Sequence, residues 1–263
     1  MMAFTQDVLG IFSLDQKVVV VTGASAGLGA TVAVALARAG AHIVLSARNE
    51  QRLAATASQV ENSGRDALTV VSDVREAADC RRVVDAAIDR FGRVDVLVNN
   101  AGVTYAAASQ RDDPAAFGAL LQTNLVGAYQ MAQAVGKAMI DSGRGGSIIN
   151  MSSALGLRPF TLPTSAYSAS KAGLVGLTRS LAVQWTGRYG IRVNALSPGF
   201  LTTEMTADAR DSDRTLEAIL AHTPLGRLGD PAELIGPVLL LASDAGSYIT
   251  GATLAVDGGW TLH

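Results

Sequence analysis

Apolar and polar positions alternate in blocks along this chain, and each block has the length of a strand or a helix. Short runs rich in Val, Ile and Leu are typical of buried parallel strands. They stand at 17–22, 41–46, 67–72, 94–98, 147–151, 191–196 and 253–256. Between them lie stretches of helical pattern, from the first glycines to about 39 and then at 50–61, 75–91, 114–140, 166–189 and 232–243. This alternation predicts one doubly wound α/β domain over 1–263, with a parallel sheet and helices on both faces.

Two segments stand outside the alternation. Residues 1–16 form a short leader before the first strand, and residues 200–222 are polar and aperiodic. Long irregular segments within a compact domain are often binding loops or lids. We therefore expect the second segment to contact a ligand.

The stretch 75–91 is amphipathic, with its apolar residues on one helical face. They are Cys80, Val83, Val84, Ala87, Ile88 and Phe91. This placement predicts that Cys80 is a core thiol and not a nucleophile.

Two long predicted helices carry almost no charge. Between 114 and 140 the charged residue is Lys137, and between 166 and 185 the charged residues are Lys171 and Arg179. A helix that is apolar nearly all round lacks a solvent face. The pattern predicts a homo-oligomer in which a second subunit covers these helices. The alternative is that many alanines of these helices are simply exposed to solvent.

Composition narrows the function class. The chain is 49% hydrophobic and 17% charged, and its net charge is −2. A basic run of the kind that binds phosphate backbones is absent, so no nucleic-acid partner is expected. The single cysteine fits a reducing compartment. We see no signal peptide in 1–17 and no apolar run of the ~18 residues that span a membrane. We expect a cytoplasmic protein with no membrane partner and no metal site.

A glycine-rich turn follows the first strand. It reads Gly23-Ala24-Ser25-Ala26-Gly27-Leu28-Gly29 and leads directly into an alanine-rich helix. Glycines let the backbone turn tightly and approach a diphosphate, while the helix N-terminus offers free N–H groups to the anion. Strand, glycine turn and helix together predict a dinucleotide site, and the alternative is a simple tight turn.

The end of the second strand bears on the choice of cofactor. An Asp or Glu there would bind the ribose 2′-hydroxyl of NAD, but the sequence is Ala47-Arg48-Asn49. A guanidinium at that place can pair with a 2′-phosphate, which favours NADP(H) over NAD(H). The alternative is that Arg48 is a solvated loop arginine.

Small residues follow the strand at 94–98, in the sequence Asn99-Asn100-Ala101-Gly102. The carboxyl ends of parallel strands are where such a sheet receives its ligand. We therefore expect this segment to lie at the ligand site.

Tyr167 and Lys171 are four residues apart on a predicted helix, so their side chains share one face. An ammonium beside a phenol favours the phenolate, and we expect the pKa of Tyr167 to fall. A phenol that gives or takes a proton near neutral pH suits alcohol–ketone chemistry.

Four motifs in order resemble those of the short-chain dehydrogenase/reductase family, and the resemblance covers essentially the whole chain. They are the glycine turn from Thr22 to Gly29, Asn99 to Gly102, Tyr167 to Lys171, and Ser197-Pro198-Gly199. The resemblance implies a Rossmann sheet of about seven parallel strands, commonly in a tetramer.

The resemblance also implies catalytic roles. Tyr167 would exchange a proton with the substrate oxygen, and Ser153 would hydrogen-bond that oxygen. We prefer Ser153 to Ser152 because two residues and a glycine follow it. Lys171 would hold the nicotinamide ribose and lower the pKa of Tyr167, and Asn124 would order a relay water. From the residues alone, Asn124 is equally a buried amide that satisfies backbone groups.

On the cofactor side, the resemblance implies that Asp73, with Val74 beside it, meets the adenine. Asn100, Ala101 and Gly102 would line the adenosine ribose. Leu201 and Thr203, after Pro198 and Gly199, would meet the carboxamide and a phosphate. Ser25, Ala26, Gly27 and Leu28 complete the turn around the diphosphate.

Three features depart from the family pattern. The segment between Ser153 and Tyr167 is one residue longer than usual. Ala26 stands where many NADP-dependent members carry a basic side chain, which weakens the Arg48 argument. The loop 155–164 matches no particular substrate, although Leu155, Leu157, Phe160, Leu162 and Phe200 would form an apolar wall.

The substrate therefore stays open at this point. Arg158 is the one cation in that loop, and it would meet an anionic substrate group, another subunit or solvent. We lean to a 3-oxoacyl thioester of the acyl-carrier-protein reductase type. The alternatives are a sugar or polyol dehydrogenase of the gluconate type and, in another class, a non-catalytic nucleotide sensor.

Overall fold

The computed structural model describes residues 9–203, 206 and 212–262. A seven-stranded parallel sheet forms its centre, in the order β3-β2-β1-β4-β5-β6-β7. The strands are β1 Val18–Thr22, β2 His42–Ala47, β3 Ala67–Val71, β4 Val96–Asn99, β5 Gly146–Met151, β6 Ile191–Pro198 and β7 Thr253–Val256. The sequence-based prediction of a doubly wound sheet with about seven strands is confirmed.

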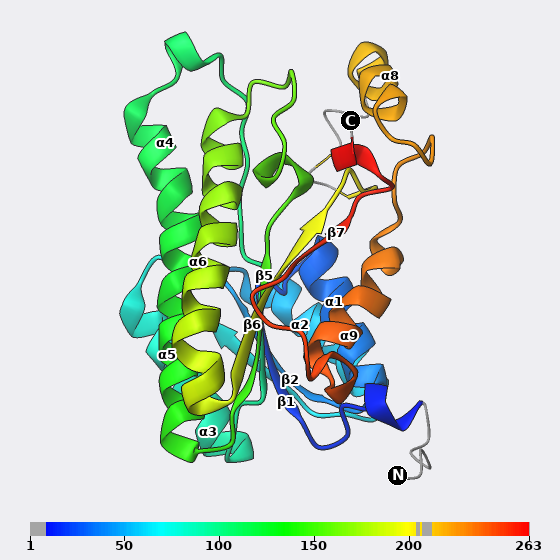
Figure 1. Cartoon of the computed structure of the whole chain (residues 1–263). Helices are drawn as coiled ribbons and strands as arrows, with labels where there is room; N and C mark the ends of the chain where they lie inside the picture. Colours follow the sequence, from blue (N-terminus) through cyan, green and yellow to red (C-terminus); the bar gives the residue numbers. More distant parts are fainter. Residues whose placement is uncertain (1–8, 204–205, 207–211, 263) are drawn as a thin grey trace.

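Helices cover both faces of the sheet (Figure 1). On one face lie α1 Gly27–Arg38, α2 Glu50–Glu61 and α9 Ile235–Ala242. On the other lie α3 Ala77–Phe91, α5 Gly127–Ser142 and α6 Ser165–Tyr189, with α4 Pro114–Leu121 beside α6. The short helix α8 is Asp213–Ala221, and 3-10 turns stand at Gly10–Phe12, Ser109–Arg111, Ala154–Gly156, Pro231–Leu234, Asp244–Gly246 and Trp260–Leu262.

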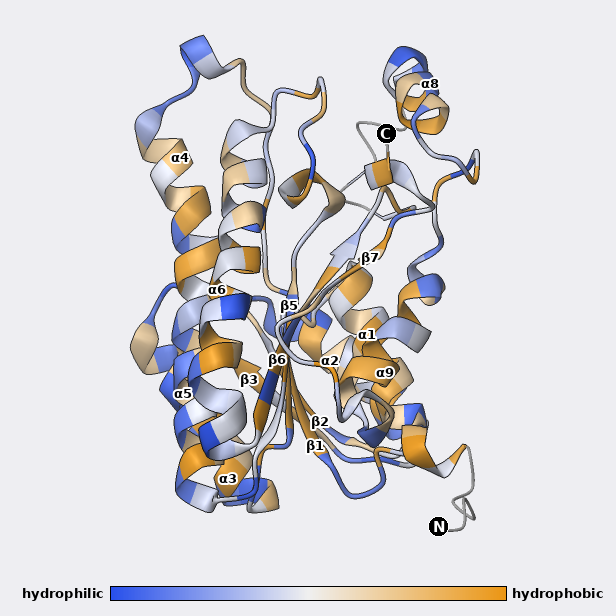
Figure 2. Cartoon of the chain, in the orientation of Figure 1, coloured by the Kyte–Doolittle hydropathy of each residue, from blue (hydrophilic) through white to orange (hydrophobic). Residues whose placement is uncertain are grey.

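The central strand β1 shows why these runs are apolar throughout. Val19 and Val21 pack into the core on the α1 face, whereas Val18 and Val20 pack into the core on the α5 face. Successive side chains of a strand point to opposite faces, so a strand covered on both sides needs no polar position. Figure 2 accordingly shows apolar colouring concentrated along the central strands.

The strand order reverses at β1, which pairs with β2 on one side and with β4 on the other. Open α/β sheets bind ligands in the crevice at such a switch point, outside the carboxyl ends of the strands. The glycine turn after β1 and the segment 99–102 after β4 both open onto this crevice.

Three local predictions need correction. The stretch 114–140 is not one regular helix, because a π-helical turn at Gln122–Val126 separates α4 from α5. The polar segment 200–222 contains helix α8. Ile88, at the edge of the apolar face of α3, is 37% exposed, whereas Cys80 is buried as predicted.

Candidate active site

Ser153, Tyr167 and Lys171 come together where β5 ends and α6 begins. Ser153 and Tyr167 line the same two cavities, and the Ser153 hydroxyl is close enough to act on the pKa of the Tyr167 phenol. Lys171 Nζ lies 5.5 Å from the centroid of the Tyr167 ring and donates a 2.6 Å hydrogen bond to the carbonyl of Met151. Ser152 instead turns its hydroxyl to the Lys171 carbonyl, at 2.8 Å. Of the two adjacent serines, Ser153 is therefore the one that meets Tyr167.

A glycine explains why the loop after Ser153 can lie so close to α6. A Cβ on Gly156 would lie 2.7 Å from the carbonyl carbon of Lys171, closer than real Cβ contacts come. The loop can therefore pack directly on the α6 backbone only where no side chain stands. This contact keeps Ser153 next to Tyr167.

Burial dominates the electrostatics of the site. It raises the pKa of Tyr167, while the hydrogen bond with Ser153 acts in the opposite direction. It also lowers the pKa of Lys171 to about 8. The expected fall in the pKa of Tyr167 is therefore wrong for this chain alone, because the cost of burying a phenolate exceeds the stabilisation that the chain supplies. Burial likewise raises the pKa of the Cys80 thiol to about 11, as suits a core cysteine.

Asn124 lies in the π-helical turn and is fully buried. Its amide accepts a 2.8 Å hydrogen bond from Val103 N and donates to Val103 O and to Ser170 Oγ, at 2.9 and 3.1 Å. The side chain thus ties the loop after β4 to α6. π-turns often occur at functional sites. This geometry agrees with the buried-amide interpretation and leaves the relay role as a proposal.

The glycine turn is held closed by hydrogen bonds between β1 and β4. Thr22 Oγ1 accepts from the backbone N–H groups of Asn100 and Ala101, each at 3.0 Å. Gly23 has a φ of +64°, and a Cβ on Gly29 would lie 2.5 Å from Asn100 Nδ2. Gly23 thus makes the turn, while Gly29 allows α1 to start against β4. The turn forms a cradle that would be filled by any larger side chain.

A cleft of about 610 Å³ opens between this turn and the ends of β2 and β3. Predicted cofactor residues line it, namely Gly23, Ser25, Ala26, Arg48, Asp73, Val74, Ala101 and Gly102. Arg52 lines it as well and was missed. Its position in the sequence could have indicated this role, because it stands four residues after Arg48. Asn49 caps the helix between them, and its side chain accepts a 2.9 Å hydrogen bond from the backbone N–H of Arg52.

Asp73 is engaged within this cleft. Its carboxylate forms an ion pair with Arg75 at 2.6 Å, and this hydrogen bond lowers the pKa of Asp73. Carboxylate oxygens have several lone pairs, so Asp73 keeps acceptor capacity for an adenine amino group.

A smaller cavity of about 100 Å³ joins the cleft to the catalytic residues. Most of its lining was predicted: Leu28, Asn100, Gly102, Ser153, Tyr167, Lys171, Pro198, Gly199, Leu201 and Thr203. Of the remaining predicted site residues, Gly27 and Gly29 shape the turn, and Asn124 lies behind the lining. The segments at the ends of β1, β4, β5 and β6 thus supply this lining together.

A pocket of about 330 Å³ lies beside Tyr167, and it is the candidate substrate pocket. Of the predicted apolar wall, Leu155, Leu162 and Phe200 line it. Leu157 is 40% exposed, and Phe160 lines a neighbouring cavity, so these two predictions are wrong. Hydroxyl-bearing residues complete the lining and were missed, namely Thr104, Tyr105, Thr164, Thr206 and Thr215.

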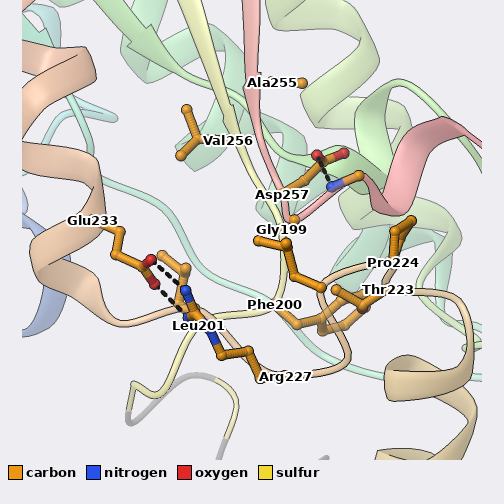
Figure 3. Close-up of a pocket in the computed structure, with 14 residues that line it drawn as sticks. Gly199, Phe200, Leu201, Thr223, Pro224, Arg227, Glu233, Ala255, Val256 and Asp257 are labelled. Atoms are coloured by element: carbon orange, nitrogen blue, oxygen red, sulfur yellow. Dashed lines mark hydrogen bonds and ion pairs between the residues drawn. The ribbon is translucent and has the colours of Figure 1, made fainter.

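Leu201, after β6, pairs with Gly229 in an isolated parallel bridge. A cavity of about 490 Å³ lies beside this bridge. Figure 3 shows Gly199 and Phe200 among its lining residues, together with the ion pair of Arg227 and Glu233. The nitrogen and oxygen of this ion pair are 2.7 Å apart.

Among the described residues, no cluster of His, Cys, Asp or Glu could hold a metal ion. Within the same part of the chain, no helix has the length and apolar character needed to cross a membrane.

The glycine-rich turn lies at the point where the strand order reverses, beside Ser153, Tyr167 and Lys171. This arrangement is that of a nicotinamide-dependent oxidoreductase. The chain belongs to the short-chain dehydrogenase/reductase family. A family model described as enoyl-(acyl carrier protein) reductase matches residues 23–261. The enzyme class is therefore established, and the alternative of a non-catalytic sensor is not supported.

Similar proteins include sugar and polyol dehydrogenases. The chain is 38% identical to 2-dehydro-3-deoxy-D-gluconate 5-dehydrogenase of Escherichia coli, over 96% of this chain and 98% of that protein. It is 40% identical to D-threitol dehydrogenase of Mycolicibacterium smegmatis, over 95% of each. A crystal structure of gluconate 5-dehydrogenase from Burkholderia cenocepacia with NADP and tartrate has a TM-score of 0.92, with 38% identity over 97% of this chain and 99% of that one.

Proposed function

We propose that this protein is an NADP(H)-dependent dehydrogenase of neutral secondary alcohols of the polyol type, or of the corresponding ketones. The observation that carries the proposal is the lining of the substrate pocket. Seven lining residues bear hydroxyls, namely Thr104, Tyr105, Ser153, Thr164, Tyr167, Thr206 and Thr215. None of the described lining residues is charged. Such a lining suits a neutral, hydroxyl-bearing substrate better than an anionic one.

The cleft fits a nicotinamide dinucleotide. Gly23 and Gly29 let the turn pack closely on Asn100 and Ala101, and the N-terminus of α1, which has no side-chain cap, offers its N–H groups to a diphosphate. Arg48 and Arg52 line the adenosine end. Two guanidinium groups at this end favour the 2′-phosphate of NADP(H) over the hydroxyl of NAD(H).

The nicotinamide, when bound, supplies or takes the hydride. The side chains of this chain handle the proton. Tyr167 gives a proton to the substrate oxygen in reduction and takes it in oxidation, and Ser153 hydrogen-bonds the same oxygen. Lys171 holds its ammonium beside Tyr167, and Asn124 orders a water behind Lys171. Bound substrate and cofactor exclude water from this site, which strengthens the effect of the ammonium on the pKa of Tyr167.

Tyr105 supports the polyol class. Its hydroxyl donates to the carboxylate of Asp112, at 2.9 and 3.0 Å from the two oxygens. A phenol has one hydrogen to give, so the bound hydroxyl offers only lone pairs to a further partner. A substrate hydroxyl can donate to it, whereas a carbonyl or a methylene cannot.

The second candidate is reduction of a 3-oxoacyl thioester. The apolar part of the pocket, formed by Leu155, Leu162 and Phe200, favours it because an acyl chain would pack there. The hydroxyl lining favours the polyol class, and we rank that class first.

A turnover screen with both cofactors tests the proposal. The panel contains threitol and galactitol as neutral polyols, gluconate as an acid, and an acetoacetyl thioester as the acyl substrate. We expect the highest kcat/KM for a polyol with NADP⁺. Turnover of the thioester alone would contradict the first candidate and support the second.

We also propose that the enzyme is cytoplasmic and works as a homotetramer or homodimer. Helices α5 and α6 expose large apolar side chains, with Tyr129 42% and Val183 87% exposed. Exposed apolar groups of this size on adjacent helices are typical of subunit contacts. Analytical sedimentation of Val183→Glu tests the oligomeric state, since a charge on this exposed face of α6 should dissociate the oligomer.

A further inference from the structure

A second cavity, of about 310 Å³, lies beside the substrate pocket. It is lined by Arg158, Pro159, Phe160, Thr161, His222 and Trp260. An aromatic partition separates the two spaces. Phe200 lines the substrate pocket, and its ring lies 6.2 Å from that of Phe160 and 5.6 Å from that of Trp260.

The polar side chains around this second cavity include the guanidinium of Arg158, the indole of Trp260 and the hydroxyl of Thr161, and no carboxylate is among the described lining residues. The imidazole of His222 also lines the cavity, but its N–H is directed elsewhere. His222 Nδ1 lies 2.9 Å from the carbonyl of Ala218, and because a carbonyl only accepts, this nitrogen carries the proton. A cavity with donors and without an acidic partner favours an anion.

Two of these donors lack a partner. Arg158 Nη1 and Trp260 Nε1 are buried and make no hydrogen bond. Among the buried unpartnered side-chain atoms of the described residues, these are the two nitrogens, and the others are oxygens. Buried N–H groups without a partner are rare in native proteins. Arg158 and Trp260 both line the cavity, but these two nitrogens are themselves buried, so Arg158 Nη1 meets an acceptor there only when its side chain turns.

The two residues differ in their freedom to move. Trp260 is 1% exposed and is fixed by the rings of Phe160 and Phe200. Arg158 is only half-buried, so its guanidinium can turn toward an occupant of the cavity. Arg158 is therefore suited to be the ligand, whereas the Trp260 N–H is both fixed and buried.

We propose that this cavity binds a carboxylate or phosphate group, with Arg158 as its main ligand. Occupation also affects helix α8. His222 stands at the end of α8, and its ring packs on the edge of Phe160 at 5.1 Å. An anion bound to Arg158 fixes the loop 157–162, on which the His222 ring packs, and thereby holds the end of α8 beside the substrate pocket. The group has two possible sources, a free anion or the charged end of a longer substrate.

The first experiment measures binding and does not depend on turnover. Holoenzyme saturated with NADP⁺ is titrated with inorganic phosphate at constant ionic strength, and the melting temperature and the tryptophan fluorescence are recorded. Saturated cofactor prevents phosphate from binding at the dinucleotide cleft. We expect a saturable rise in melting temperature, with binding at least about tenfold weaker in Arg158→Gln. Arg144→Gln is the control, because it removes the same charge from an exposed loop.

The second experiment separates the two sources. If the anion is free, phosphate changes the KM for a neutral polyol, and Arg158→Gln removes the change. If it belongs to the substrate, Arg158→Gln lowers kcat/KM about tenfold for a carboxylate-bearing alcohol and leaves the neutral one unchanged.

Two results together would overturn the proposal. In the titration, the wild type shows no saturable response, or Arg158→Gln responds as Arg144→Gln does. In the kinetics, Arg158→Gln leaves kcat/KM for the carboxylate-bearing alcohol unchanged. If every polyol fails in the turnover screen, the proposed function is contradicted. The anion site is still decided by the binding experiment, which does not need turnover.

Discussion

Lys171 Nζ lies 5.5 Å from the centre of the Tyr167 ring and is bonded to the Met151 carbonyl at 2.6 Å. The ammonium is thus held beside the phenol by a backbone group at the end of β5. Lys171 is 4% exposed, and burial lowers its pKa to about 8. The buried Lys171 ammonium therefore lowers the stability of the fold, but its position beside Tyr167 is the one that proton transfer requires.

The first prediction concerns proton transfer. Tyr167→Phe removes the only group proposed to exchange a proton with the substrate and keeps the ring that packs with Ala154 and Leu155. We expect kcat to fall by about 10²–10⁴-fold. NADPH binding, measured by fluorescence titration, should stay within about twofold. Full activity of this variant would refute the assigned mechanism.

The second prediction concerns stability and its pH dependence. Below pH 8 Lys171 is protonated in both the folded and the unfolded state, and its burial costs about 3 kcal/mol. Between pH 8 and 10.5 the folded protein releases its proton first, so the stability of the wild type rises with pH. Lys171→Met removes this cost and also one hydrogen bond worth about 1 kcal/mol.

We therefore expect Lys171→Met to be inactive and about 2 kcal/mol more stable than the wild type at pH 7. Its advantage should shrink by roughly 1 kcal/mol at pH 9. Urea unfolding at both values measures this. Lys137→Met is the control, because Lys137 is exposed and pairs with Asp141. A constant advantage between the two pH values would contradict the assignment to Lys171.

The third prediction concerns the cofactor. Arg48→Ala removes one guanidinium from the adenosine end of the cleft. We expect NADPH to bind about tenfold more weakly, since a charge-assisted hydrogen bond is lost, and NADH to bind within about twofold of wild type. Fluorescence titration with each cofactor measures both constants, with Arg144→Ala as the control. Equal affinity of the wild type for NADH and NADPH would remove the basis for this role.

The fourth prediction concerns the substrate. Tyr105→Phe removes the lone pairs proposed to accept a substrate hydroxyl. We expect kcat/KM for threitol to fall about tenfold and that for butan-2-ol to stay the same. In Asp112→Ala the Tyr105 hydroxyl regains a free hydrogen, which should favour substrates with an acceptor group. Tyr248→Phe, at a fully exposed tyrosine, should change nothing, and equal losses on both substrates in Tyr105→Phe would indicate a merely structural role.

Sequence patterns were most informative where structure is local. Positions 18–21 are all valine because both faces of β1 are covered, and the prediction of a buried parallel strand follows from that. Gly23 and Gly29 predict the turn from the sequence because only glycine permits those close backbone approaches. Tyr167 and Lys171 share a helix, so their proximity follows from helical spacing alone.

The tertiary structure decided what distant segments bring together. Tyr105 and Thr215 line one pocket although they lie far apart in the chain, and neither belongs to a periodic pattern. Phe160 turns away from the substrate pocket because its ring packs with Phe200, His222 and Trp260. The pKa of Tyr167 depends on burial, which the spacing to Lys171 does not reveal. The amino-acid sequence by itself thus determined the fold and the proximity of Tyr167 to Lys171, since these depend on local periodicity and turn chemistry. The pocket linings and the unpartnered donors depend on long-range packing, which only the folded chain defines.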